Sequence, residues 1–197
     1  ESRSREHAVT LTAIEDEIAN GLTHGIGLVM ALVGLAILMM LALTRGDGWQ
    51  IAGCAVYGIS LVILYSASTL YHAARNPKLK EFLRTVDHIA IFLLIAGTYT
   101  PFTLVNLRGN WGALLFVVVW SVAILGIAAK IAWGDRWQWI SLCAYLGLGW
   151  CGVAALKPVL ATFPPQAIAL LIAGGVAYTV GTIFFALDRI RYFHAVW

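Results

Sequence analysis

Side chains capable of acid–base or metal chemistry lie near the ends of long apolar stretches of this chain. Ser68 and His72 close one stretch, and Asp87 lies near the start of the next. His24 lies near the start of the first stretch, and His194 follows the last. Residues four apart on a helix share one face, so Ser68 and His72 are expected to act on the same side.

A metal ion would explain why an apolar chain holds these groups. Ionisable side chains cost about 2.5–3.5 kcal/mol at the centre of a membrane helix, and usually face the bundle interior or a cavity. Imidazole is a neutral nitrogen ligand, and zinc held by three protein ligands keeps a fourth position for water, whose pKa falls to about 7. A nearby carboxylate can orient that water or take its proton. Asp87 is positioned for this role.

Each of these residues also has an explanation without chemistry. A serine in a membrane helix, such as Ser68, most often hydrogen-bonds to its own helix backbone. His24 and His72 could extend to lipid phosphates at the interface. Asp87 could pair with Arg84 or accept hydrogen bonds at a helix start. The residues alone leave these explanations and the metal site open.

The composition identifies a membrane protein. Of 197 residues, 60% are hydrophobic and 12% charged, whereas soluble domains are about 25% charged. A membrane-spanning helix takes about 20 apolar residues. The apolar runs predict an all-α, polytopic seven-helix bundle with six complete spans and a seventh opening near residue 190; the six are 20–43, 49–72, 83–105, 111–132, 137–157 and 166–187. Residues 1–19 are predicted to form a separate N-terminal segment before a membrane domain over 20–197.

The distribution of basic residues predicts the orientation. The N-terminal segment and the loops after the second, fourth and sixth spans hold all but three of the 13 Lys and Arg residues. Because basic loops stay in the cytoplasm, the N-terminus is predicted to be cytoplasmic. The net charge of +3 then reflects topology and contact with anionic lipid. Membrane lipids, and not nucleic acid, are the expected partners.

Short motifs occur in order along nearly the whole chain. They are ExxNxxTH at 17–24, SxxxH at 68–72, Asp87, AGTYTPF at 96–102 and RYFHAVW at 191–197. Together they resemble the bacterial hemolysin III branch of the progestin and adipoQ receptor (PAQR) family. The resemblance implies seven helices, a cytoplasmic N-terminus and, for this branch, location in the bacterial inner membrane.

The resemblance also implies a Zn²⁺ ion near the cytoplasmic face. In the family's receptors one histidine of SxxxH and two of an HxxxH motif on the last helix hold the zinc, and an aspartate on the third helix bonds to its water. This makes His72 and His194 the expected ligands. The third histidine would fall immediately after Trp197, where the sequence stops. The seventh helix and the ligand set are therefore expected to be truncated in this chain.

Three functions follow from the resemblance. Relatives in the wider superfamily resemble ceramidases, which favours a metal-dependent hydrolase of lipid amide or ester bonds. Asp87 would be its base, Ser68 would position water or the oxyanion, and His24 would support the ligands. The alternative is a non-enzymatic membrane-homeostasis or sensor protein with structural zinc, which is fully ligated by protein. A cytolytic pore ranks third, because apolar spans offer few charged groups to line a channel.

Overall fold

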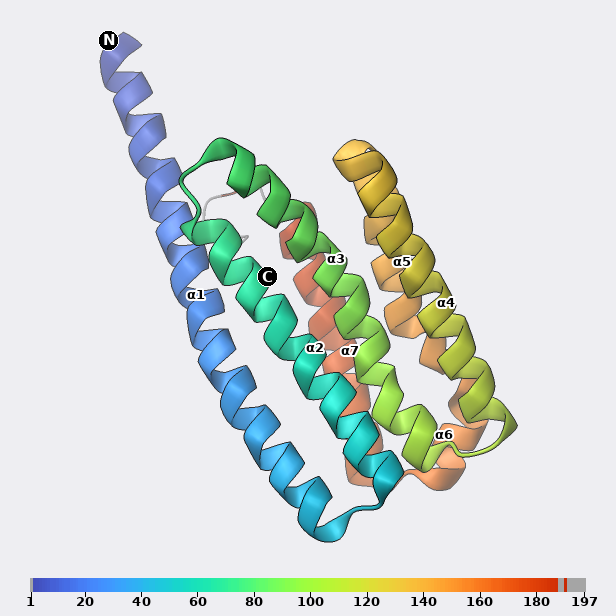
Figure 1. Ribbon diagram of the computed structural model, residues 1–197. Helices are drawn as coiled ribbons and strands as arrows, with labels where there is room; N and C mark the ends of the chain where they lie inside the picture. Colours follow the sequence, from blue (N-terminus) through green and yellow to red (C-terminus); the bar gives the residue numbers. More distant parts are fainter. Residues whose placement is uncertain (1, 188–189, 191–197) are drawn as a thin grey trace.

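The computed structural model describes residues 2–187 and 190, with side chains from Glu15 onward except those of residues 135 and 137. Long helices lie side by side, with α1 to α4 following one another across the view and α5 and α7 behind them (Figure 1). The elements are α1 (Ser2–Arg45), α2 (Gly48–Ala73), α3 (Pro77–Pro101), the π-helical η1 (Phe102–Asn106), α4 (Asn110–Trp133), η2 (Gly134–Trp137), α5 (Gln138–Trp150), η3 (Cys151–Ala155), α6 (Leu156–Thr162) and α7 (Pro165–Ala186).

The described residues form an all-helical fold, and each of the six predicted complete spans coincides with a helical stretch that is long and apolar enough to cross a membrane. The helices long and apolar enough to cross a membrane are Glu15–Arg45, Gly48–Ala73, Pro77–Asn106, Asn110–Trp133, Gln138–Thr162 and Pro165–Ala186. Residues 2–19 continue into the first span as one helix, α1. The predicted seventh span beyond residue 190 lies outside the described residues.

Polar caps define the two turns that join the first three helices. Asp47 caps α2 by accepting hydrogen bonds from the backbone N–H groups of Trp49 and Gln50, and the Gln50 side chain accepts from the Asp47 N–H at 2.8 Å. Asn76 caps α3, and Pro77 occupies its first turn, where the missing N–H costs nothing. The chain therefore reverses direction twice within short turns.

The span predicted over 137–157 is broken and extends farther than expected, to Thr162. It passes at Cys151 from α5 into the 3₁₀ segment η3 before α6 completes the crossing. The Tyr99 hydroxyl of α3 accepts a hydrogen bond from the Gly152 N–H at 2.9 Å. It also lies 3.0 and 2.8 Å from the carbonyl oxygens of Leu148 and Gly149. A side chain of α3 thus satisfies backbone groups that the break would expose to hydrocarbon.

Close contact between α2 and α3 sets the positions of the residues they carry. A Cβ atom on Gly53 would lie 2.8 Å from Cα of Pro101, and one on Gly97 would lie 2.2 Å from Oγ of Ser60. Small residues let membrane helices approach in this way. On its other side, α3 packs Phe92 against Tyr145 of α5, with ring centroids 4.5 Å apart. The middle helix α3 is thereby fixed from both sides.

Candidate metal and catalytic site

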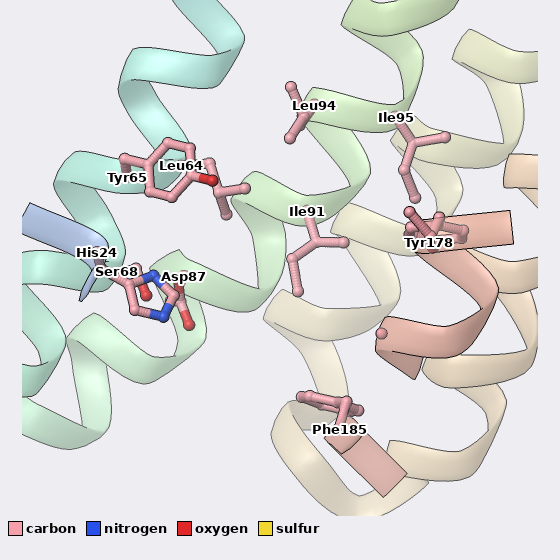
Figure 2. Close-up of a pocket in the computed structure, with 12 residues that line it drawn as sticks. His24, Leu64, Tyr65, Ser68, Asp87, Ile91, Leu94, Ile95, Tyr178 and Phe185 are labelled. Atoms are coloured by element: carbon pink, nitrogen blue, oxygen red, sulfur yellow. The ribbon is translucent and has the colours of Figure 1, made fainter. Parts of the chain in front are cut away.

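Polar side chains from three helices meet at one end of the bundle, where α2 ends and α3 begins. We call this the site end. Ser68 and His72 lie in the last turns of α2, Asp87 lies on α3, and all three are buried. The side chains of Ser68 and Asp87 lie close together (Figure 2). The chain reversal at Asn76 brings these residues to the same depth, as the sequence predicted.

A cavity of about 320 Å³ opens beside Ser68 and Asp87. Its polar end is formed by His24, Ser68 and Asp87, whose side chains lie close together in Figure 2. The rest of the wall comes from α2, α3 and α7: Leu64, Tyr65, Ile91, Leu94, Ile95, Ala177, Tyr178, Gly181 and Phe185. The cavity is therefore mainly apolar, with its acid–base groups at one end.

His72 lies next to this polar end. Its ring centroid is 5.4 Å from that of His24, and a Cβ atom on Gly21 would lie 3.7 Å from Cβ of His72. The described cavity wall contains His24 and not His72. His24 was predicted only to support the ligands, yet it is the histidine that shares the cavity with Asp87.

Two charged residues at the site were not identified as site residues from the sequence. Nδ1 of His72 lies 2.9 Å from Oε2 of Glu17, and the other oxygen of that carboxylate lies 2.8 Å from Nζ of Lys80. Lys80 also lies over the Tyr71 ring, 5.1 Å from its centroid. One signal was available for Glu17: it precedes His24 by seven residues, or two helical turns, and so shares its helix face.

The histidines present fit part of a zinc site. Among the residues that the structure describes, no three His, Cys, Asp or Glu side chains form a group that could hold a metal ion. His194, the other predicted ligand, lies outside the described residues. Nε2 of His72 is buried, and Nδ1 contacts a carboxylate, as in most metal-ligating histidines. His72 is therefore suited to act as one ligand.

Sequence comparisons identify the family of this chain. The model of the family described as Haemolysin-III related matches residues 12–197. The chain belongs to the haemolysin III-related family. The Hemolysin-3 homolog of Bacillus subtilis is 42% identical over 184 residues, covering 93% of this chain and 86% of the relative. The Hemolysin-3 of Bacillus cereus is 41% identical, with 93% and 84% covered.

A more distant relative comes from animals. The human Monocyte to macrophage differentiation factor is 28% identical to this haemolysin III-related chain over 190 residues, covering 92% of this chain and 76% of the relative. No solved structure gives a significant match. The comparisons thus establish family membership along nearly the whole chain.

Proposed function

We propose that this haemolysin III-related membrane protein binds one zinc ion at the site end and hydrolyses amide or ester bonds of lipids there. The observation that carries the proposal is the cavity, which combines a long apolar wall with Ser68, Asp87 and His24 at one end. A lipid needs an apolar surface for its chains and a polar centre for the bond to be cleaved. This cavity offers both.

The proposed ligands are His72, His194 and the histidine expected after Trp197. Bound zinc supplies Lewis-acid polarisation of the scissile carbonyl and lowers the pKa of a water molecule. His72 is suited to this role because it is buried at the end of α2 and contacts Glu17 through Nδ1. His24 packs against its ring and limits its movement.

Asp87 is the proposed base. It is buried at the polar end of the cavity, where its carboxylate would hold the attacking water and accept its proton. The Ser68 side chain lies close to this carboxyl group (Figure 2), and its hydroxyl would fix the orientation of the carboxylate by donating a hydrogen bond. The apolar wall excludes other water, which strengthens each polar interaction at the cavity's end.

The proposed topology has seven spans, with the N-terminus and the site end on the cytoplasmic side of a bacterial inner membrane. The excess of Lys and Arg in the N-terminal segment and alternate loops supports this orientation. The two Bacillus relatives support a bacterial membrane. A site near the inner leaflet would receive lipids laterally from the bilayer.

The structural-zinc alternative is favoured by a different observation. The His72 side chain is only 2% exposed and is not among the residues of the described cavity wall. A metal enclosed by protein and closed to water would stabilise the fold without catalysis. In that case the protein would serve membrane homeostasis or sensing without turnover.

Zinc content and lipid hydrolysis, measured on the full-length protein in detergent, test the proposal. We expect about one zinc per chain by plasma mass spectrometry, and release of fatty acid from ceramides or phospholipids. Asp87→Asn should keep its zinc and lose at least about 100-fold in rate, because it removes the base. The matched control is Asp47→Asn, at the opposite end of the bundle.

Three outcomes separate the candidates. Equal rates for the wild type and Asp87→Asn on every lipid class would exclude hydrolysis at this site. Zinc without hydrolysis, combined with a large loss of thermal stability when zinc is removed, would establish the structural alternative. A wild type without zinc would overturn both.

A further inference from the structure

A single carboxylate connects three helices at the site end. Glu17 belongs to α1, His72 to the last turn of α2 and Lys80 to the first turn of α3. One carboxylate oxygen contacts Nδ1 of His72 at 2.9 Å, and the other contacts Nζ of Lys80 at 2.8 Å. The Glu17 and Lys80 side chains are 37% and 29% exposed. The buried imidazole is thus tied to a partly exposed ion pair.

This contact determines which ring nitrogen of His72 carries the proton. An ionised carboxylate only accepts hydrogen bonds, and the ion pair with Lys80 favours an ionised Glu17. Nδ1 of His72 must therefore be the donor. In the neutral imidazole the lone pair then lies on Nε2, which is the buried ring nitrogen.

The local shape of α1 supports this arrangement. Glu17 and His24 lie two turns apart, about 10.5 Å along the helix, and both contact His72. Gly21 lies between them, and a Cβ atom there would make an ordinary van der Waals contact with Cβ of His72 at 3.7 Å, so α1 passes close to this residue. The imidazole is therefore held on one side by a hydrogen bond and on another by a ring contact.

We propose that Glu17 is a positioning residue that holds His72 as the Nδ1–H tautomer, with Nε2 directed to a metal ion, and that Lys80 keeps Glu17 in place. The consequence for metal affinity rests on the proposed zinc function, whereas the tautomer does not. Carboxylate partners of metal-ligating histidines typically contribute about 10–100-fold in affinity. A similar loss is expected when Glu17 is removed.

Nitrogen-15 NMR of histidine-labelled, zinc-free protein tests the tautomer directly. The chain has five histidines, and the His72 signals are those absent from His72→Gln. The wild type should show Nδ1–H for His72, whereas Glu17→Ala should shift the population toward Nε2–H. The matched control is Glu81→Gln, which removes an exposed carboxylate next to Lys80 and should leave the signals unchanged.

Chelator competition on the same variants measures zinc affinity. Glu17→Ala should weaken binding by about 10–100-fold, Glu17→Gln by less, and Lys80→Gln by less than Glu17→Ala. Gel filtration checks the fold. If Glu17→Ala is misfolded, the zinc affinities of Glu17→Gln and Lys80→Gln test the proposal instead.

The outcomes distinguish this inference from the proposed function. Zinc binding by the wild type with unchanged affinity in the Glu17 variants would overturn the inference alone. Nε2–H for His72 in the wild type would also overturn it. A wild type without zinc but with the Nδ1–H tautomer, lost in Glu17→Ala, would overturn the proposed function and support the role of Glu17.

Discussion

Each end of the bundle carries a carboxylate paired with a cation from another part of the chain, but the two carboxylates make different further contacts. At the α1–α2 turn, Asp47 pairs with Arg108 at 2.5 Å, and both side chains are about half exposed. Asp47 also accepts from two backbone N–H groups at the start of α2. At the site end, Glu17 pairs with Lys80 and holds a buried imidazole.

The difference separates a carboxylate that caps a helix from one that holds a side chain of another helix. Asp47 satisfies backbone donors that every helix start leaves open, and an exposed ion pair adds little to stability. Glu17 instead contacts a side chain 55 residues away in sequence. Glu17 therefore does not cap a helix; it contacts a buried histidine, in keeping with the positioning role proposed for it.

The largest expected effect is a loss of bound zinc, which a substitution at the site end should cause and one at the opposite end of the bundle should not. His72→Ala removes a proposed zinc ligand, so zinc per chain should fall from about one to background by plasma mass spectrometry. Asp47→Ala removes a carboxylate from the opposite end and should keep its zinc. Full zinc content in His72→Ala would show that the site end does not bind metal through this residue.

A second test compares two buried serines of α2. Ser68→Ala should slow lipid hydrolysis roughly 10- to 100-fold, because the proposed hydrogen bond from Ser68 to the charged Asp87 would contribute about 1.5–3 kcal/mol. Ser60 is equally buried but donates to the Tyr57 carbonyl oxygen at 2.7 Å, so Ser60→Ala should keep the wild-type rate. Equal rates in both variants would remove the role proposed for Ser68.

A third test destabilises the bundle away from the site end. The Cβ atom of Gly53→Ala would meet the Pro101 backbone, and overpacking of this kind costs about 1–3 kcal/mol. Unfolding in denaturing detergent should show this loss, with zinc content unchanged. Gly34 is the control, because a Cβ atom there would meet nothing within 4 Å. Equal stability of the two variants would contradict the close α2–α3 contact.

The span positions could be predicted because a membrane helix must be apolar over about 20 residues. The prediction for α2 was 49–72 and the structure has Gly48–Ala73. The meeting of Ser68 with Asp87 was also predictable, since a short turn must return the chain to the same depth. Hydropathy therefore predicts the depth of a residue along its membrane span, and this depth was sufficient to predict that Ser68 and Asp87 lie near each other.

Lateral contacts between helices were not predictable. Hydropathy does not say which helix faces α5. The hydrogen bonds of the Tyr99 hydroxyl, and the break at Cys151 whose backbone groups they satisfy, were therefore not predicted. Glu17 was missed for another reason: residues 1–19 were predicted to form a separate N-terminal segment, although the spacing of Glu17 to His24 was visible in the sequence. In the structure they continue as one helix, α1, that passes alongside His72.

The smallest expected effect concerns the Asp47–Arg108 pair. The hydrogen bond from Arg108 lowers the pKa of Asp47 below its ordinary value of 3.8. Stabilisation by the charged form is therefore complete above pH 3.8 and is lost as the pH falls through the lower folded-state pKa. Asp47→Asn should have a slightly lower melting temperature at neutral pH, and the difference should disappear in acid. A difference that persists in acid would contradict this account.

The hydroxyl of Tyr99 has a further consequence, for how the chain enters the membrane during synthesis. The break between α5 and η3 leaves backbone groups of Leu148, Gly149 and Gly152 to be satisfied from elsewhere, and the hydroxyl of Tyr99 on α3 does so. Ribosomes deliver the chain from its N-terminus, so α3 has emerged before Gly152 is made. The order of synthesis therefore places the required partner in the bilayer before the broken helix arrives.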